Sequence, residues 1–292
     1  MRIWLTYLML LIATLSIAQQ ERVAKALEFV EAGDYDKAKI EIDAAVTHET
    51  TNSDSYAWYV KGFIYKELYK KYEKNNPLSP LRNEAIASLK KSMELDNKGE
   101  NINENKQTLK FLATTLNNDA ANSLSNNNAE AAQKAFEKYK EVILLIEPNT
   151  NLKPKTIEFL LALASMLNQQ YQLEQDSAKK EFKFLGVKNM YQEVLKLDSN
   201  NISANYNLGI LYYNKAVNII NNLDYDMDMF ALMEIQDNCV AIFKQSLPYM
   251  EKALELDPNR VETLLGLEGI YISLNEFEKS NAIRARLDAL GK

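Results

Sequence analysis

Cysteine and histidine are almost absent from this chain of 292 residues, which contains one of each, Cys239 and His48. A single cysteine excludes an intramolecular disulfide, and its apolar neighbours indicate a buried thiol that packs as a small hydrophobic side chain. One His and one Cys, far apart in the sequence, exclude a zinc site of the His/Cys type. They also give no strong signal for a Cys–His nucleophile pair.

Glycine and proline are scarce as well, with 8 and 6 residues, and so leave few tight turns. This argues against an all-β sandwich and favours a nearly all-helical fold. The glycines do not have the spacing of a phosphate-binding loop, and there is no Gly-x-Ser-x-Gly elbow. The run from Asp224 to Asp228 begins like a calcium loop, but Met229 and Ile235 stand where such a loop needs Gly and Glu. We therefore expect no metal, no cofactor and no enzymatic activity.

The overall composition, with 47% hydrophobic and 25% charged residues, is that of an ordinary soluble globular protein. A disordered chain would be less apolar. Acidic residues outnumber basic ones, 40 to 34, for a formal net charge of −6. This negative charge disfavours nucleic acid and anionic membrane surfaces as partners.

Residues 1–18 differ from the rest and predict a secretory signal peptide. Met1-Arg2 precedes sixteen uncharged residues that end with the small residues Ser16 and Ala18 near the break. The run is short for a bilayer span, which needs about 20 residues, so cleavage is favoured over a retained anchor. The sequence thus predicts an exported protein, periplasmic or secreted, with no membrane span after cleavage.

Two phrases recur along the remainder of the chain. The first reads Trp58-x2-Lys61-Gly62-x2-Tyr65, Asn205-x2-Leu208-Gly209-x2-Tyr212 and Leu264-x2-Leu267-Glu268-x2-Tyr271. The second has the form small-x3-large-x2-small, as in Ala38/Ile42/Ala45, Ala85/Leu89/Ser92 and Ser246/Met250/Ala253. Spacings of three and four place each set on one helical face, with the small residue where a neighbouring helix comes close. Two such helices form a hairpin that buries its apolar face by stacking on further copies.

The two phrases and their connectors predict six hairpins in a single domain over residues 19–292. Their approximate bounds are 20–47, 54–97, 104–147, 154–199, 202–258 and 261–290. The second contains a Pro-rich insertion, Asn75 to Pro80, and the fifth is about 25 residues longer than a repeat of about 34. Pro248 lies inside its second helix and is expected to kink or restart it.

On these residues the chain resembles tetratricopeptide-repeat (TPR) proteins, whose unit reads W-x2-L-G-x2-Y followed by A-x3-F and a closing Pro. The string Ala253-Leu254-Glu255-Leu256-Asp257-Pro258 is similar to a typical repeat end. Lys61 in place of Leu and Glu268 in place of Gly depart from the pattern. The resemblance implies an all-α fold, a right-handed superhelix (α-solenoid) of about six hairpins, irregular because of the insertions.

The resemblance also implies a concave groove lined by the first helix of each hairpin. The corresponding positions here are Tyr56, Tyr59, Phe63, Tyr206, Ile210, Tyr213, Glu262 and Leu265. Tyrosines suit such a wall because they bury a large area and still present a hydroxyl. The alternative is that some of these side chains simply pack against the neighbouring repeat.

The expected function is a non-enzymatic scaffold or adaptor of the cell envelope that binds a protein or peptide in this groove. Two alternatives remain open. The chain could bind a small molecule or a glycan, since Tyr and Asn stack on and hydrogen-bond to sugars. The long fifth hairpin could instead mediate self-association.

Overall fold

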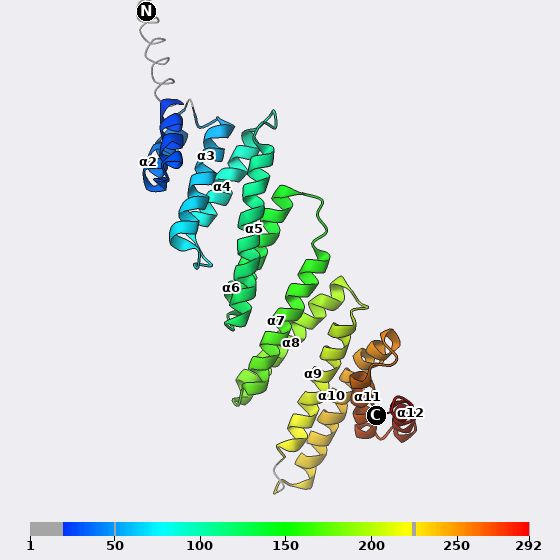
Figure 1. The fold of residues 1–292 in the computed structure, drawn as a ribbon. Coiled ribbons are helices and arrows are strands. Elements are labelled where there is room, and N and C mark those ends of the chain that lie inside the picture. Colours follow the sequence, from blue (N-terminus) through cyan, green and yellow to red (C-terminus); the bar gives the residue numbers. More distant parts are fainter. Residues whose placement is uncertain (1–19, 50, 224–225, 292) are drawn as a thin grey trace, which may run out of the picture. The chain divides into compact units, whose positions relative to one another are not determined.

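The computed structural model describes residues 20–49, 51–223 and 226–291, and over these residues the chain is all-helical and without strands. Figure 1 shows the helices as successive antiparallel pairs. They are a helix over 20–31, α2 (Tyr35–Val46), α3 (Ser55–Leu68) with a π-helical turn η1 (Tyr69–Glu73), α4 (Pro80–Leu95), α5 (Ile102–Ser125), α6 (Ala129–Ile146), α7 (Lys153–Leu173), α8 (Ser177–Leu197), α9 (Ile202–Asn221), α10 (Met229–Leu256), α11 (Val261–Ser273) and α12 (Phe277–Ala289).

The described helices thus form six hairpins, as the fold class predicted. They divide into two compact units, with the boundary between Asn151 and Leu152. The single domain over 19–292 stays a prediction. The signal peptide predicted for residues 1–18 lies outside the described residues. Within the described part of the chain, no helix combines the length and the apolar character that a membrane span requires.

The hairpin turns follow from short polar residues and from residues that tolerate a positive φ. Gly33 has φ +73° at the end of the first helix, and Asp34 then accepts a hydrogen bond from the Lys37 amide at 3.2 Å to cap α2. Asn127 and Asn275 take the same left-handed backbone conformation in the third and sixth hairpins. At these turns the chain reverses direction between the first and the second helix of a hairpin.

The small and large residues of the two repeated phrases meet inside the second and fifth hairpins. A Cβ atom on Gly62 of α3 would lie 2.6 Å from Leu89 Cγ of α4. A Cβ atom on Gly209 of α9 would lie 2.5 Å from Met250 Cγ of α10. Both glycines therefore allow an approach of two helices that a side chain at that position would prevent.

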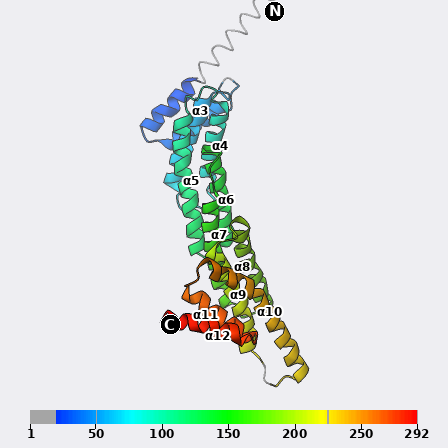
Figure 2. The same cartoon turned by 90° about the vertical axis from the view of Figure 1, so that its right-hand side faces the viewer.

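The fifth hairpin is the largest, with 20 residues in α9 and 28 in α10. In Figures 1 and 2 the end of α9 and the start of α10 project past the α11–α12 hairpin of the same unit. Of the two outcomes expected at Pro248, the helix does not restart there, because α10 continues through it from Met229 to Leu256, and a kink stays a prediction. Cys239 is buried on α10 with its Sγ 3.9 Å from the Ala216 carbonyl oxygen, as the prediction of a packed thiol requires.

Candidate partner-binding surfaces

The predicted groove residues fall on two separate surfaces, one in each compact unit. Three of them lie on α3 in the first unit, at spacings that form one stripe along the helix: Tyr56, Tyr59 and Phe63. The other five lie on α9 and α11 in the second unit: Tyr206, Ile210, Tyr213, Glu262 and Leu265. Each surface has to be considered by itself.

On α3, Tyr56 is exposed, and Tyr59 and Phe63 are half-buried. The rings of Tyr56 and Tyr59 lie 6.0 Å apart at an interplanar angle of 37°, and the Lys66 Nζ lies 4.0 Å from the centre of the Phe63 ring. Burial raises the pKa of Tyr59, and the nearby charge of Glu104 adds to this. Its hydroxyl therefore stays neutral and can donate a hydrogen bond over the whole physiological range.

On the second surface, Tyr206 of α9 is covered by an arginine. The guanidinium carbon of Arg260 lies 4.0 Å from the centre of the Tyr206 ring, and the Arg260 Nε lies 3.5 Å from a carboxylate oxygen of Glu262. Burial raises the pKa of Tyr206, so the phenol stays neutral beside this pair. The guanidinium that stacks on this ring still has hydrogen-bond donors for a ligand.

Apolar side chains continue the same surface along α11. Leu265 is 51% exposed and Ile272, two turns further on, is 50% exposed. Residues seven apart lie on one face of a helix, so the two side chains form a stripe beside Arg260 and Glu262. The arrangement offers apolar contact next to one cation and one anion.

Ile210 and Tyr213 have a different role from the exposed members of the set. A Cβ atom on Gly266 would lie 3.1 Å from Ile210 Cδ1, and one on Gly269 would lie 2.7 Å from the Tyr213 hydroxyl. The Tyr213 ring is also 5.6 Å from the Phe243 ring. Both side chains therefore pack α9 against α11, as the alternative interpretation of the sequence foresaw, and their part in a groove wall stays a prediction.

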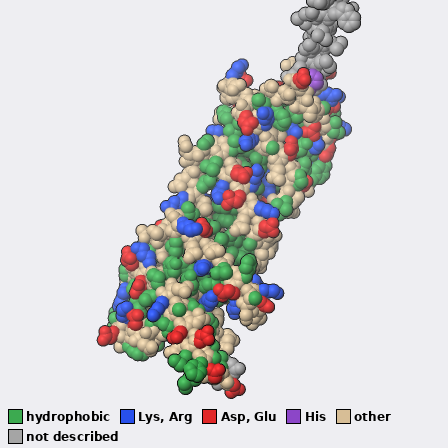
Figure 3. Space-filling view, turned by 180° about the vertical axis from the view of Figure 1, so that it is seen from behind, with side chains coloured by type: hydrophobic (Ala, Val, Ile, Leu, Met, Phe, Trp, Pro, Cys, Tyr) green, Lys and Arg blue, Asp and Glu red, His purple; other side chains and the backbone are tan. Residues whose placement is uncertain are grey.

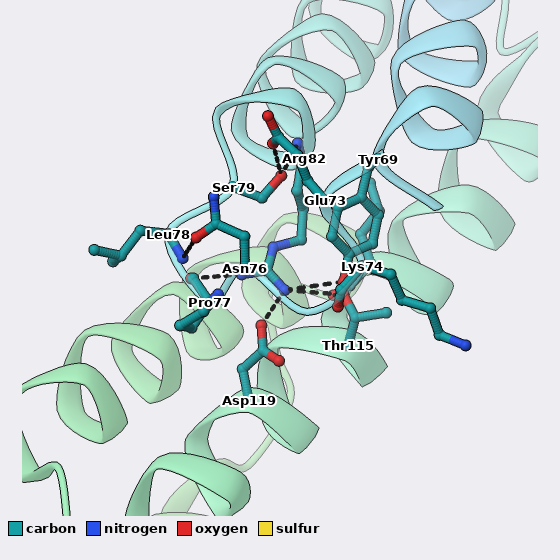
Figure 4. A network of polar contacts seen from close by, with 11 residues as sticks. Tyr69, Glu73, Lys74, Asn76, Pro77, Leu78, Ser79, Arg82, Thr115 and Asp119 are labelled. Atoms are coloured by element: carbon teal, nitrogen blue, oxygen red, sulfur yellow. Dashed lines mark hydrogen bonds and ion pairs between the residues drawn. The ribbon is translucent and has the colours of Figure 1, made fainter. Parts of the chain in front are cut away.

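Three features of the structure were missed from the sequence. The first is a buried polar network around Arg82, shown in Figure 4, which attaches the Pro-rich insertion of the second hairpin to α5. The guanidinium donates to the Pro77 carbonyl at 2.7 Å, to Thr115 Oγ1 at 3.3 Å and to Asp119 at 2.5 Å. An arginine that is 1% exposed and whose two terminal nitrogens donate to groups of the chain itself serves the fold rather than a ligand.

The second is a cleft of about 760 Å³ between α7, α8, α9 and α10. Its walls include the amide side chains of Asn218, Asn222 and Asn238 and an ion pair in which Lys215 Nζ lies 2.7 Å from Glu181. The third is an exposed apolar end on α10. Hydrophobic periodicity does not reveal the cleft or the exposed end, because polar cleft residues and exposed apolar residues have the same periodicity as ordinary helix faces.

Over the described residues, no group of His, Cys, Asp and Glu side chains is placed to hold a metal ion. The surfaces described above consist of aromatic, apolar and paired charged side chains on stacked helical hairpins. In the second and fifth hairpins, a glycine of the first helix packs against a large side chain of the second helix, and both residues belong to the repeated phrases. Over the described residues the protein is therefore all-α and built of antiparallel helical hairpins, the architecture that the resemblance to tetratricopeptide-repeat proteins implies.

Comparison with known proteins finds no matching family model and no matching curated protein. Among solved structures, 29 chains match. One is PilW, a widely conserved type IV pilus biogenesis factor, at 16% identity and a TM-score of 0.34 over 93% of both chains. Another is the complex of the TPR2AB domain of yeast Sti1 with pHSP90, at 12% identity and a TM-score of 0.27 over 92% of this chain and 89% of that one. At such TM-scores these likenesses carry no argument about partners or function.

Proposed function

We propose that this chain is a non-enzymatic scaffold that binds a protein or peptide segment on the α9–α11 surface. The observation that carries the proposal is the group formed by Tyr206, Arg260, Glu262 and Leu265. An aromatic ring carries a stacked guanidinium at the start of α11, and Leu265, one turn after Glu262 on the same helix, is half exposed. Interfaces are enriched in Tyr and Arg.

The chemistry of the surface favours an extended or helical peptide with an apolar side chain and a nearby carboxylate or carbonyl. Leu265 and Ile272 would bury the apolar part, and the Arg260 guanidinium would donate to the acceptor. The neutral hydroxyl of Tyr206 adds a donor at the edge of the same surface. The α3 stripe of Tyr56, Tyr59 and Phe63 is proposed as a second contact region of the same aromatic type.

The cell envelope is the proposed location. Its support is the sequence of residues 1–18, with a basic start, an uncharged apolar run and small residues before the break. The sequence favours a cleaved segment, which would release the helical part of the chain into the periplasm or the medium.

A photo-crosslinking amino acid at position 265 in the intact cell tests the binding proposal. The expected result is one crosslinked protein, whose yield falls at least about tenfold in Tyr206→Ala and Arg260→Ala variants, as expected for central interface residues. Ile40 is 66% exposed on α2 and provides a control, because Ile40→Ser should leave the yield unchanged. Equal yields in all variants would show that this surface does not bind the partner.

The cleft between α7 and α10 supports the alternative that the chain binds a small molecule such as a glycan. Its volume of about 760 Å³ lies in the range of small-ligand sites, and its amide side chains can donate to and accept from sugar hydroxyls. A glycan that binds there should raise the melting temperature of the protein, and Asn218→Ala should abolish that rise. A rise that Asn218→Ala leaves intact would place the ligand elsewhere.

A further inference from the structure

The outer end of the fifth hairpin exposes more apolar surface than its fold requires. Phe230 is 86% exposed and Met229 is 76% exposed, and Met233 follows one turn later on α10 and is also exposed. In Figure 3, hydrophobic side chains gather at this end of the molecule with acidic side chains at their border. Contiguous exposed apolar patches on soluble proteins mark interaction sites.

A groove continues the exposed patch toward the core. It has a volume of about 330 Å³ and lies between α9, α10 and the turn that joins α11 to α12. Apolar side chains dominate its walls, namely Ile220, Leu223, Leu232, Ile235, Val240 and Phe243. On α10 the groove residues and the exposed methionines recur every three or four positions, so they form one continuous apolar face.

The part of the fifth hairpin that forms this face, residues 216–243, has charged side chains of one sign only. The sequence contains no Lys or Arg between Lys215 and Lys244. Acidic residues of the same stretch lie at the end of the hairpin and along α10, and the described ones are Asp226, Asp228, Glu234 and Asp237. Glu234 and Asp237 share a helical stripe with Phe230, at spacings of four and seven residues. The apolar patch therefore has an acidic border.

This charge decides between the possible occupants. A second copy of the chain that docked through the same end would bring two acidic borders together, which is unfavourable. An anionic lipid surface would be repelled for the same reason. A basic protein segment would gain both apolar burial and charge complementarity, and unbranched methionines adapt their shape to varied partners.

We propose that the end of the α9–α10 hairpin is a further docking surface, specific for a cationic amphipathic helix of a partner protein. The apolar face of that helix lies against Met229, Phe230 and Met233 and reaches the groove, and its Lys or Arg residues face Glu234 and Asp237. This surface lies apart from Tyr206 and Leu265, so the inference does not rest on the function proposed for the α9–α11 surface.

A synthetic helical peptide of about 18 residues, composed of Leu and Lys in an amphipathic pattern, provides the probe for the test with the full chain. Fluorescence anisotropy should show binding that weakens at least about tenfold in Phe230→Ser and in Glu234→Gln/Asp237→Asn. A Leu/Glu peptide of the same pattern should not bind. The helical circular-dichroism signal should be unchanged in each variant, because the substituted side chains are exposed.

Phe182→Ser provides the matched control. Phe182 on α8 is 78% exposed, and Lys179 lies one turn before it on the same helix. The same loss of an exposed aromatic ring there should leave binding of the Leu/Lys peptide unchanged, and so should Tyr206→Ala. Equal binding by the wild type and Phe230→Ser would overturn the proposal. So would equal binding of the Leu/Glu peptide, or dimerisation or binding to anionic phosphatidylglycerol vesicles that Phe230→Ser abolishes.

Discussion

The second and fifth hairpins both contain more residues than a regular repeat, and they place the extra residues in different ways. In the second hairpin the insertion after η1 folds back and is attached to α5 by the buried Arg82. In the fifth the extra residues lengthen α9 and α10 and leave Met229 and Phe230 exposed. One insertion makes contacts inside the molecule, and the other presents an apolar face to solvent.

The comparison shows that the repeat fold accepts long insertions in either form, because each hairpin needs only its neighbours to bury its core. A polar network with several partners fixes one geometry and is sensitive to the loss of any member. An exposed apolar end contributes little to folding and remains available for an intermolecular contact. Substitutions in the two insertions should therefore act on different properties, stability in one and binding in the other.

The largest effect is expected for Arg82→Ala. The substitution removes the guanidinium from Asp119, Thr115 and the Pro77 carbonyl and leaves a largely buried carboxylate without its cation. Loss of one member of such a pair lowers the free energy of unfolding by about 3–5 kcal/mol. Urea denaturation followed by the fluorescence of Trp58, on α3 of the same unit, measures this loss.

Lys134→Ala is the matched control for Arg82→Ala. Its ion pair with Glu130 on α6 has a similarly short distance of 2.6 Å, but both side chains are exposed. Exposed pairs contribute little, so the free energy of unfolding should change by less than about 0.5 kcal/mol. Similar losses for the two variants would mean that the network around Arg82 does not hold the second insertion.

Smaller losses in the free energy of unfolding are expected at the glycines where paired helices approach closely, a feature that the two units share. Gly62→Ala and Gly209→Ala each place a Cβ atom within 2.6 Å of a side chain of the paired helix. The overlap should exceed the gain in helix propensity and lower the free energy of unfolding by about 1–3 kcal/mol. Gly186 on α8 faces open space, so Gly186→Ala should instead stabilise by up to about 1 kcal/mol. Destabilisation by Gly186→Ala would contradict this explanation.

A second feature common to both units is a hydrogen bond from the Tyr that ends the first repeated phrase to a carboxylate. The Tyr65 hydroxyl donates to Asp43 at 2.9 Å, and the Tyr271 hydroxyl donates to Glu251 at 2.9 Å. Burial and then the neighbouring carboxylate raise the pKa of Tyr65 from its ordinary 10.0 to about 12, and the pKa of Tyr271 is raised for the same reasons. Each carboxylate comes from the second helix of the preceding hairpin, on α2 and α10.

These raised pKa values predict a loss of stability at alkaline pH. The folded state favours the protonated phenol, so its contribution is fully present below pH 10 and is lost as the pH rises from about 10 through about 12. Urea denaturation at a series of alkaline pH values measures the free energy of unfolding. This free energy should fall less steeply with pH for Tyr65→Phe than for the wild type. An identical dependence in the two proteins would show that Tyr65 is not protonated preferentially in the folded state.

The sequence predicted the hairpins because their signals are local. A small residue, a large residue and a turn residue within one repeat are enough to define each helix and its face. Gly33 and Asp34 show this at the first turn, and Gly62 and Leu89 show it at the second hairpin. The positions for packing and for the groove, however, are adjacent on the same helix, so periodicity alone could not separate Tyr213, which packs on Gly269, from Tyr206.

Two other features depend on contacts between distant residues. Arg82 has the pattern of a surface residue, and its partner Asp119 is 37 residues away, so neither predicts a buried pair from the sequence. Met229 and Phe230 continue the apolar pattern of α10, and only the structure shows that the hairpin projects past its neighbour. One signal was available in advance, because the sequence between Lys215 and Lys244 has acidic residues but no basic ones.

The smallest effect on stability is expected for Phe230→Ser, at less than about 0.5 kcal/mol in the free energy of unfolding, because the ring is already in solvent. Phe243 lies on the same helix and is buried, so Phe243→Ala should lower that free energy by about 3–5 kcal/mol. Urea denaturation followed by circular dichroism measures both. If Phe230→Ser were as destabilising as Phe243→Ala, the end of the fifth hairpin would be part of the core, and the contrast with the second hairpin would fail. A silent Phe230→Ser means instead that folding does not require this aromatic ring at its exposed position.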